Sequence, residues 1–235
     1  MTSSEIIKFL ILRTIGNFLV LFALFGVGAT FGPALYLEVS YRLMTAKGVT
    51  YKVITSRSVQ NKQVFQSNVN VEPGFSTILS DAKSRVLTPK DTLFDVVIPK
   101  IGANAQVFPN IDPTNEQEYV NALKKGVAHA KGTVFPGMQG SIYLFAHSTD
   151  NFWDVGRYNA VFYLLKDLTI GDDVTLFFQN KRYNYTVTNT KIIDGNDVSY
   201  LVDAQHTHKE QVILQTCWPP GTTWKRLLVI AEPAK

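Results

Sequence analysis

The sequence predicts a mainly β domain, a closed barrel or a sandwich, that follows an N-terminal transmembrane helix. Three observations lead to this prediction. Short runs of β-branched and aromatic residues crowd the chain after residue 91, helical patterns are rare there, and a long uncharged segment lies near the N-terminus. The 235 residues suffice for one domain of ordinary size, with about fifty residues to spare.

The uncharged segment runs from residue 15 to residue 37. With a rise of about 1.5 Å per residue, it is long enough to cross a hydrocarbon core of about 30 Å. Basic residues precede it within 1–14, so the positive-inside rule favours an internal N-terminus, although basic residues also follow it. A cleaved signal peptide is the alternative, but its apolar region would be shorter and no clear A-x-A site follows. We expect a cytoplasmic stretch at 1–14 and an uncleaved anchor at 15–37.

Residues 38–90 are polar, and single Val and Phe residues are spread among Ser, Thr, Asn, Gln and Lys. The alternating stretch 64–71 fits an edge strand, while a Pro-Gly pair and a further proline interrupt the segment. We expect a stalk or a loosely docked extension here, and the folded domain at 91–235.

Strand signals are dense in this last part, where Gly, Asn, Asp and Pro separate the apolar runs. The expected strands are 93–98, 141–146, 173–178, 182–189, 191–193, 211–216 and 226–231. Residues 179–181 would form a hairpin turn between two of them. Helices are expected only at 115–125, with Asp112 or Thr114 as the cap, and at 160–167. Seven or eight short strands with little helix imply a closed barrel or a sandwich.

Composition excludes several classes of function. The single cysteine rules out an internal disulfide framework and every multi-cysteine zinc or iron–sulfur site. The net charge of +4 comes from scattered Lys and Arg residues, so nothing indicates binding to nucleic acid. An anionic membrane surface or a cell-wall polymer is compatible with this charge.

Cys217 is the first candidate for chemistry. A lone cysteine is most often a small core residue, but this one stands where a strand meets the Pro-Gly loop 218–221, which is a position at a barrel rim. Loops on rigid scaffolds are where catalytic groups are commonly placed. Trp218 and the prolines would either wall a groove beside the thiol or form only a rigid turn.

A cysteine nucleophile needs a base or a positive neighbour that favours the thiolate. All four histidines precede Cys217, which excludes papain-like enzymes, in which the histidine lies downstream. His147 has the best context, because it ends an apolar run and begins a polar loop. His129 looks structural. His206 and His208 look like solvated loop residues, because a metal pair would need a third ligand nearby.

Arg226 begins the last strand, nine residues after Cys217. This spacing allows a loop and a return, so adjacent antiparallel strands would bring both residues to one rim. An arginine there would polarise a carbonyl and stabilise an oxyanion. The alternative is an exposed strand-end arginine.

The order of His147, Cys217 and Arg226 resembles the sortase family. The sortase signature is a Leu-x-Thr-Cys strand end followed by a strand that begins with arginine, and this chain carries Leu-Gln-Thr-Cys at 214–217. Upstream segments at 98–102, 126–137 and 162–172 resemble the family in the same order, so the resemblance covers about residues 93–233. The departures are a serine after the histidine, an unusual post-cysteine loop and no clear autoinhibitory lid.

The resemblance implies a closed eight-stranded barrel with short helices and the activity of a cysteine transpeptidase, a thiol peptidase. Cys217 would attack a carbonyl within a C-terminal sorting signal of a secreted protein. His147 would protonate the departing amine and deprotonate the incoming one. Arg226 would hold the substrate carbonyl and the oxyanion, and Thr216 and Trp218 would bind substrate.

The resemblance also implies partners and a location. An amine of the cell wall or of a pilin would resolve the thioester. The N-terminal helix would make the protein a single-pass protein of the cell membrane with an extracellular catalytic domain. The chemistry requires no cofactor and no metal, and the few acidic clusters do not indicate the calcium that some sortases bind.

Two other functions are kept as alternatives. A cysteine transpeptidase of the L,D type acts on peptidoglycan, but its Ser-His-Gly-Cys signature is missing here. A membrane-tethered β-module without enzymatic activity would use Cys217 only for packing. Thiol labelling of the native protein separates the two uses of this cysteine.

Overall fold

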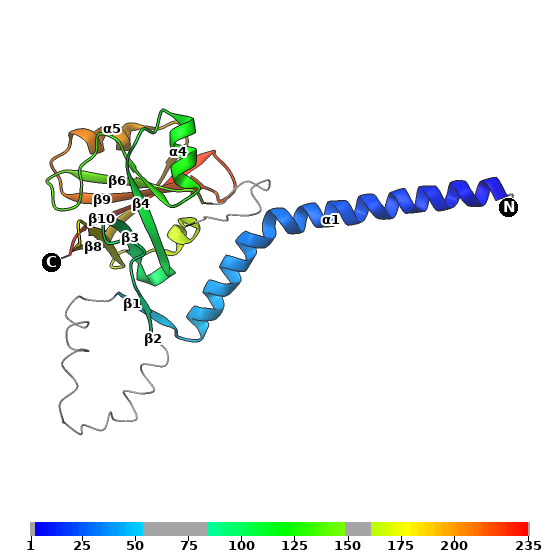
Figure 1. Ribbon diagram of the computed structural model, residues 1–235, viewed down its shortest axis with the longest axis horizontal. Coiled ribbons are helices and arrows are strands. Elements are labelled where there is room, and N and C mark those ends of the chain that lie inside the picture. The colour runs from blue at the N-terminus through cyan, green and yellow to red at the C-terminus, as the bar shows by residue number, and fades with distance from the viewer. Residues whose placement is uncertain (1–2, 54–83, 149–160, 235) are drawn as a thin grey trace, which may run out of the picture.

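The computed structural model describes residues 3–53, 84–148 and 161–234. The predicted edge strand at 64–71 lies outside these ranges. Within them, eight strands form a closed barrel in the order β10-β8-β7-β3-β4-β5-β6-β9, which confirms the predicted closed eight-stranded barrel (Figure 1). The barrel strands are β3 (Phe94–Ile98), β4 (Ala103–Ile111), β5 (Val127–Ala130), β6 (Ser141–Phe145), β7 (Asp173–Phe178), β8 (Lys181–Asp194), β9 (Gln211–Trp218) and β10 (Lys225–Pro233).

The barrel is filled by the β-branched and leucine side chains that its strands turn inward. Val96, Ile142, Leu176, Leu214 and Val229 come from five different strands and are all fully buried. Burial of such side chains is the main favourable contribution to folding. The apolar runs that predict the strands therefore also supply the core.

The hairpin between β7 and β8 forms as predicted. Gln179 and Asn180 both have positive φ, at 48° and 61°, as a two-residue turn of the primed type requires. Lys181 already belongs to β8. The separate strand expected at 191–193 is instead the end of β8, which continues without a break to Asp194.

The sequence does not predict β4 or β5. Residues 127–130 read Val-Ala-His-Ala, and β4 contains two alanines, two asparagines and a proline. These residues have low intrinsic strand preference, so burial and pairing in the closed barrel decide their conformation. All four residues of β5 are buried.

The helices differ from the prediction in detail. α4 (Glu116–Leu123) lies within the predicted 115–125, but its N-cap is Asn115, whose side chain accepts from the Glu118 N–H at 3.3 Å. Asp112 is not the cap, because its carboxylate accepts from the Thr114 N–H and hydroxyl in the preceding turn. Thr114 is thereby also excluded as the cap.

The second predicted helix and the His206–His208 segment also need correction. In place of a helix at 160–167, the described part of this segment forms the short 3-10 helix η2 (Tyr163–Asp167). The unpredicted helix α5 (Ser199–His206) ends at a histidine expected in a loop, while His208 lies beyond it and both side chains are exposed.

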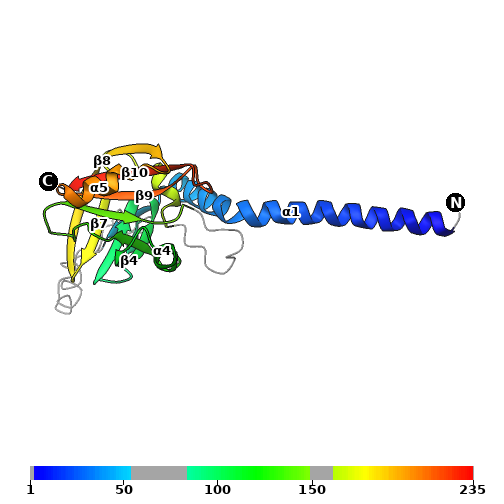
Figure 2. The same ribbon diagram turned by 90° about the horizontal axis from the view of Figure 1, so that it is seen from above.

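The N-terminal part is dominated by α1 (Ser3–Ala46), a helix of 44 residues that extends away from the barrel (Figures 1 and 2). It contains one stretch long and apolar enough to cross a membrane, Ser4–Ala29, with a mean hydropathy of 2.1 and no buried residues. This stretch overlaps the predicted anchor 15–37.

The described parts of 38–90 pack close to the barrel. α1 continues to Ala46, and β1 (Thr50–Val53) pairs in parallel with β2 (Ser84–Leu87). The Tyr51 ring lies so near Gly102, just after the 3-10 helix η1 (Pro99–Ile101), that an added Cβ there would be 3.2 Å from it. The beginning and end of the expected stalk are thus structured.

Candidate active site

The parallel pairing of β6 with β9 brings the predicted base and the predicted nucleophile to one end of the barrel. Phe145 is in register with Gln215, whose carbonyl accepts from the Ala146 N–H at 3.1 Å. The Thr216 hydroxyl then donates to the Ala146 carbonyl at 3.0 Å. His147 follows Ala146 directly.

Cys217 follows Thr216 in the same way. Since paired residues of parallel strands lie side by side, these two bonds carry His147 and Cys217 to neighbouring strand ends. The sequence places both residues at strand ends, and the pairing of residues 70 positions apart, from Phe145–Gln215 back to Ser141–Gln211, brings these ends together.

Arg226 reaches the same place from the other side of β9. The antiparallel pairing of β9 with β10 makes Arg226 the direct cross-strand partner of Cys217. Its Nη1 lies 3.7 Å from the Cys217 Sγ. The same nitrogen also donates to the carbonyls of Thr223 at 3.0 Å and Lys225 at 3.2 Å, so the loop before β10 holds the guanidinium in position.

The three side chains are only partly buried, so the thiol can be reached from solvent. The guanidinium places a fixed positive charge beside the sulfur, which is the nucleophilic atom of cysteine. The same fixed cation can donate hydrogen bonds to an oxygen that gains negative charge near the sulfur. Chemically, the arrangement suits nucleophilic attack on a carbonyl.

The two predicted substrate-binding residues lie differently. Thr216 is 3% exposed, and its hydroxyl is used by the bond to Ala146. Trp218 is partly exposed and lines a cavity of about 350 Å³ together with Lys166, Ile192 and Leu227. Trp218 therefore borders open space at the end of β9, on the opposite face of the strand from Cys217, whereas Thr216 shapes the site from beneath.

A second cavity, which sequence reasoning missed, lies along the face of β9 that carries Cys217. Alternate residues of a strand share a face, so Ile213 and Gln215 lie on the side of Cys217. Ile213 lines a cavity of about 420 Å³ between β9 and α5. Gln215 accepts from the buried Tyr143 hydroxyl on β6 at 2.5 Å. The only signal would have been α5 itself, which the sequence does not predict.

His129 is placed as a structural residue. It is fully buried, and its ring stacks on Phe135 with centroids 4.6 Å apart. Nδ1 accepts from the Asn110 N–H at 3.2 Å, and Nε2 lies 3.0 Å from the Val134 carbonyl and from the Thr133 hydroxyl. Burial lowers the pKa of His129, so the ring is held neutral.

Metal binding gains no support from the described parts of the chain. In residues 3–53, 84–148 and 161–234, no three His, Cys, Asp or Glu side chains cluster in a way that could hold a metal ion. His206, at the end of α5, has its Nδ1 2.7 Å from the Val202 carbonyl of its own helix.

Comparison with known proteins agrees with this arrangement. Residues 96–234 match the family model of the sortase domain. Sortase D of Bacillus subtilis (strain 168) is 33% identical over 138 residues, which are 57% of this chain and 60% of that protein. The chain thus matches less than two thirds of the length of this relative.

Solved structures share the fold. Sortase A from Corynebacterium diphtheriae superposes with a TM-score of 0.50 at 19% identity, over 72% of this chain and 73% of that one. Sortase C-1 from Actinomyces oris does so with a TM-score of 0.51 at 19% identity, over 76% of this chain and 96% of that one. The family model of the sortase domain matches more than half of the chain, so the chain belongs to the sortase family.

Proposed function

We propose that the protein is a cysteine transpeptidase that cleaves a C-terminal sorting signal of secreted proteins and transfers them to an amine. The observation that carries this proposal is the pairing of Arg226 with Cys217, at the barrel end where the strand leading to His147 also ends. Membership of the sortase family supports the same activity.

In the first half of the proposed reaction, the Cys217 thiolate attacks the carbonyl carbon of one peptide bond in the sorting signal. The Arg226 guanidinium, 3.7 Å from the sulfur, donates hydrogen bonds to the oxygen as it becomes negative. The C–N bond then breaks, and the His147 imidazolium gives its proton to the departing amine. The products are a thioester on Cys217 and a released C-terminal fragment.

In the second half, an amine of the cell wall or of a pilin attacks the thioester. Neutral His147 takes a proton from this amine, the C–S bond breaks, and a new amide forms while the thiolate returns. We assign substrate contact to Trp218, which directly follows Cys217 and borders a cavity at the end of β9, and the shaping of the site to Thr216. The sorting signal would enter along the β9 face that carries Ile213 and Gln215.

We further propose that the apolar part of α1 anchors the protein as a single-pass membrane protein with the barrel outside the cell. Sortases are membrane-associated enzymes of the cell surface, and α1 has the length and composition of a membrane span. The domains would then be a cytoplasmic stretch at 1–14, the anchor at 15–37, an extension at 38–90 and the catalytic domain at 91–235.

The test is a transfer screen with a peptide library that represents C-terminal sorting signals, offered together with oligoglycine or lysine amines. Mass spectrometry should detect a thioester on Cys217 and an amide product carrying the offered amine. Cys217→Ala should keep the unfolding midpoint, because alanine is small and apolar, and should form neither species. Product formation by Cys217→Ala above background would refute the nucleophile assignment.

A further inference from the structure

Four charged side chains join the end of α1 to the barrel. Lys166 of η2 lies 2.7 Å from Glu38 of α1 and 3.2 Å from Asp167. Arg42 of α1 lies 2.9 Å from Glu38 and 3.6 Å from Asp167. Two acidic and two basic groups thus alternate around one ring, which we call the helix–barrel cluster. Each group has an oppositely charged partner on both sides.

This cluster is more than a set of exposed surface charges. The side chains of Glu38, Lys166 and Asp167 are only 24%, 20% and 16% exposed, while that of Arg42 is 64% exposed. Ion pairs withdrawn from water are screened less by salt than exposed ones. The bond from Lys166 is the main cause that lowers the pKa of Glu38, so this carboxylate stays charged at neutral pH.

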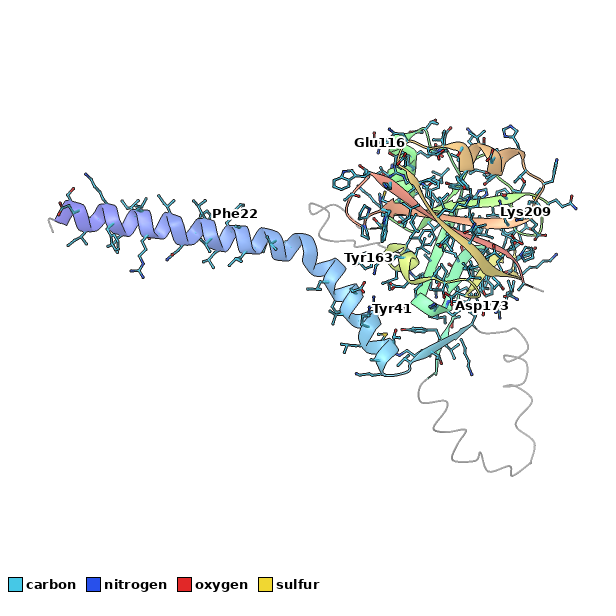
Figure 3. All side chains as sticks on the ribbon, turned by 180° about the vertical axis from the view of Figure 1, so that it is seen from behind. Phe22, Tyr41, Glu116, Tyr163, Asp173 and Lys209 are labelled. Carbon is cyan, nitrogen blue, oxygen red and sulfur yellow. The ribbon has the colours of Figure 1, made fainter. Side chains whose placement is uncertain are left out.

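Aromatic contacts support the same junction. Tyr41, one turn after Glu38 on α1, packs against the hydrophobic core of the barrel. The Lys166 ammonium lies 5.3 Å from the centre of the Tyr163 ring. Figure 3 shows Tyr41 and Tyr163 where the helix meets the barrel. The junction therefore combines apolar packing with ion pairs, and it holds the helix against η2.

The cluster lies at the catalytic end of the barrel. Lys166 lines the same 350 Å³ cavity as Trp218, which directly follows Cys217. On the α1 side, Glu38 comes nine residues after Ala29, the last residue of the apolar stretch. At a helical rise of about 1.5 Å per residue, this is about 14 Å along the axis. One set of ion pairs thus links the membrane-proximal part of α1 to the end of the barrel at which β9 places Cys217.

We propose that the helix–barrel cluster holds the catalytic end of the barrel next to the membrane surface, so that the enzyme prefers polypeptides anchored in the same membrane over free peptides. The preference rests on the proposed transpeptidase function and on α1 spanning the membrane. Docking restricts Cys217 to the layer where an anchored substrate is concentrated, whereas a released barrel would sample a much larger volume.

The positioning can be measured without any catalysis. A donor fluorophore is attached to Cys217, the single cysteine, in the full chain reconstituted into phosphatidylcholine vesicles with acceptor dyes on the lipid headgroups. Glu38→Lys should lower the energy transfer, because it places a cation beside both Arg42 and Lys166. Inverting all four charges, with Glu38→Lys, Arg42→Glu, Lys166→Glu and Asp167→Lys, should recover more than half of the loss, since every contact of the ring is then attractive again.

The matched control is Glu116→Lys, which makes the same charge change on the exposed surface of α4. This variant should leave the energy transfer unchanged. Equal energy transfer in the wild type and in Glu38→Lys would overturn the proposed positioning. So would an equal decrease in Glu116→Lys, because the effect would then come from net charge alone.

The substrate preference is tested with one recognition peptide in two forms, free and linked to a membrane helix in the same vesicles. Glu38→Lys should lower transfer from the anchored form by about fivefold or more and leave the free form unchanged. Equal losses on both forms would overturn the preference. If the wild type transfers neither form, the proposed function fails, while the energy-transfer result still decides the positioning.

Discussion

Arg226 and Cys217 are direct cross-strand partners, and the guanidinium Nη1 lies 3.7 Å from the thiol sulfur. The same register pairs Lys225 with Trp218. Because side chains alternate between the two faces of a strand, the arginine and not the lysine shares the face of the cysteine. The choice between two neighbouring basic residues, which apolar periodicity leaves open, is thus made by the strand register.

The first prediction compares these two basic residues. Arg226→Lys should lower the transfer turnover by ~10²–10³-fold, because lysine lacks the planar fork of donors that an oxyanion requires. Lys225→Ala should leave the transfer turnover nearly unchanged. Steady-state transfer on one peptide measures both, with the unfolding midpoint as the control for folding. If Lys225→Ala loses turnover while Arg226→Lys stays active, the oxyanion role has been assigned to the wrong residue.

The second prediction concerns the general acid and base. His147→Ala should lose transfer by about 10²–10⁴-fold while Cys217 still reacts with an alkylating agent, because proton transfer and thiol access are separate properties. His208→Ala, an exposed residue beyond the end of α5, is the matched control and should keep full activity.

His129→Ala should instead lose stability, because it leaves the Asn110 N–H and the Val134 carbonyl without their ring partner. If this variant keeps its fold and is as inactive as His147→Ala, the two histidines have been given the wrong roles.

The third prediction concerns the bond from the Thr216 hydroxyl to the Ala146 carbonyl, at 3.0 Å in a buried position. Thr216→Val keeps the shape but removes the donor, so we expect a loss of about 1–3 kcal/mol in unfolding free energy. Since this bond ties the strand ends of His147 and Cys217 together, kcat should fall by about tenfold while KM changes little. Thr216→Ser should retain most of the unfolding free energy and most of kcat, because serine keeps the hydroxyl donor. A Val variant with altered KM alone would instead indicate direct substrate contact.

The fourth prediction is a dependence of stability on pH. Burial lowers the pKa of His129 below its ordinary value of 6.5, so the unfolded chain binds the proton more readily than the folded one. The contribution of this residue is complete above pH 6.5 and is lost as the pH falls below that value, with a slope of at most about 1.4 kcal/mol per pH unit.

Chemical denaturation between about pH 5 and pH 8 measures this dependence. Both bounds lie about 1.5 units from the pKa of a free histidine. His129→Gln should show a flatter profile than the wild type, and the exposed His206→Gln should follow the wild type. A His129→Gln profile parallel to the wild type would place the pH dependence on other groups.

The barrel could be predicted from the sequence where apolar, β-branched runs coincide with strands, as in β3, β6, β7, β9 and β10. It could not be predicted where pairing and burial in the barrel, and not the intrinsic preference of the residues, decide the backbone conformation. β5 is built from Val127, two alanines and a histidine, and only its position between β4 and β6 makes it a strand. The cap of α4 was assigned to Asp112 or Thr114, which are three residues and one residue too early, because Asp, Thr and Asn are all good caps.

The candidate site, too, could be predicted from the sequence only in part. His147, Cys217 and Arg226 stand at strand ends that periodicity and punctuation reveal. Their spacing predicts the approach of Cys217 and Arg226, whereas the approach of His147 to them could be predicted only from the resemblance to sortases. The docking of α1 could not, because the Glu38–Lys166 pair joins residues 128 positions apart. No local pattern marks either residue as part of a junction. The cavity beneath α5 was missed for the same reason.

Strand β9 lies between β6, which comes long before it, and β10, which comes after it. Because a polypeptide is made from its N-terminus, His147 is added some seventy residues before Cys217, from 147 to 217. Arg226 is added later still. Pairings of such long sequence separation form slowly. The reactive centre is therefore incomplete until β10 has been made, and His147 joins Cys217 and Arg226 only when the long-range pairing of β6 with β9 has formed. The time at which the catalytic centre is completed is therefore set by the synthesis of the C-terminal strand.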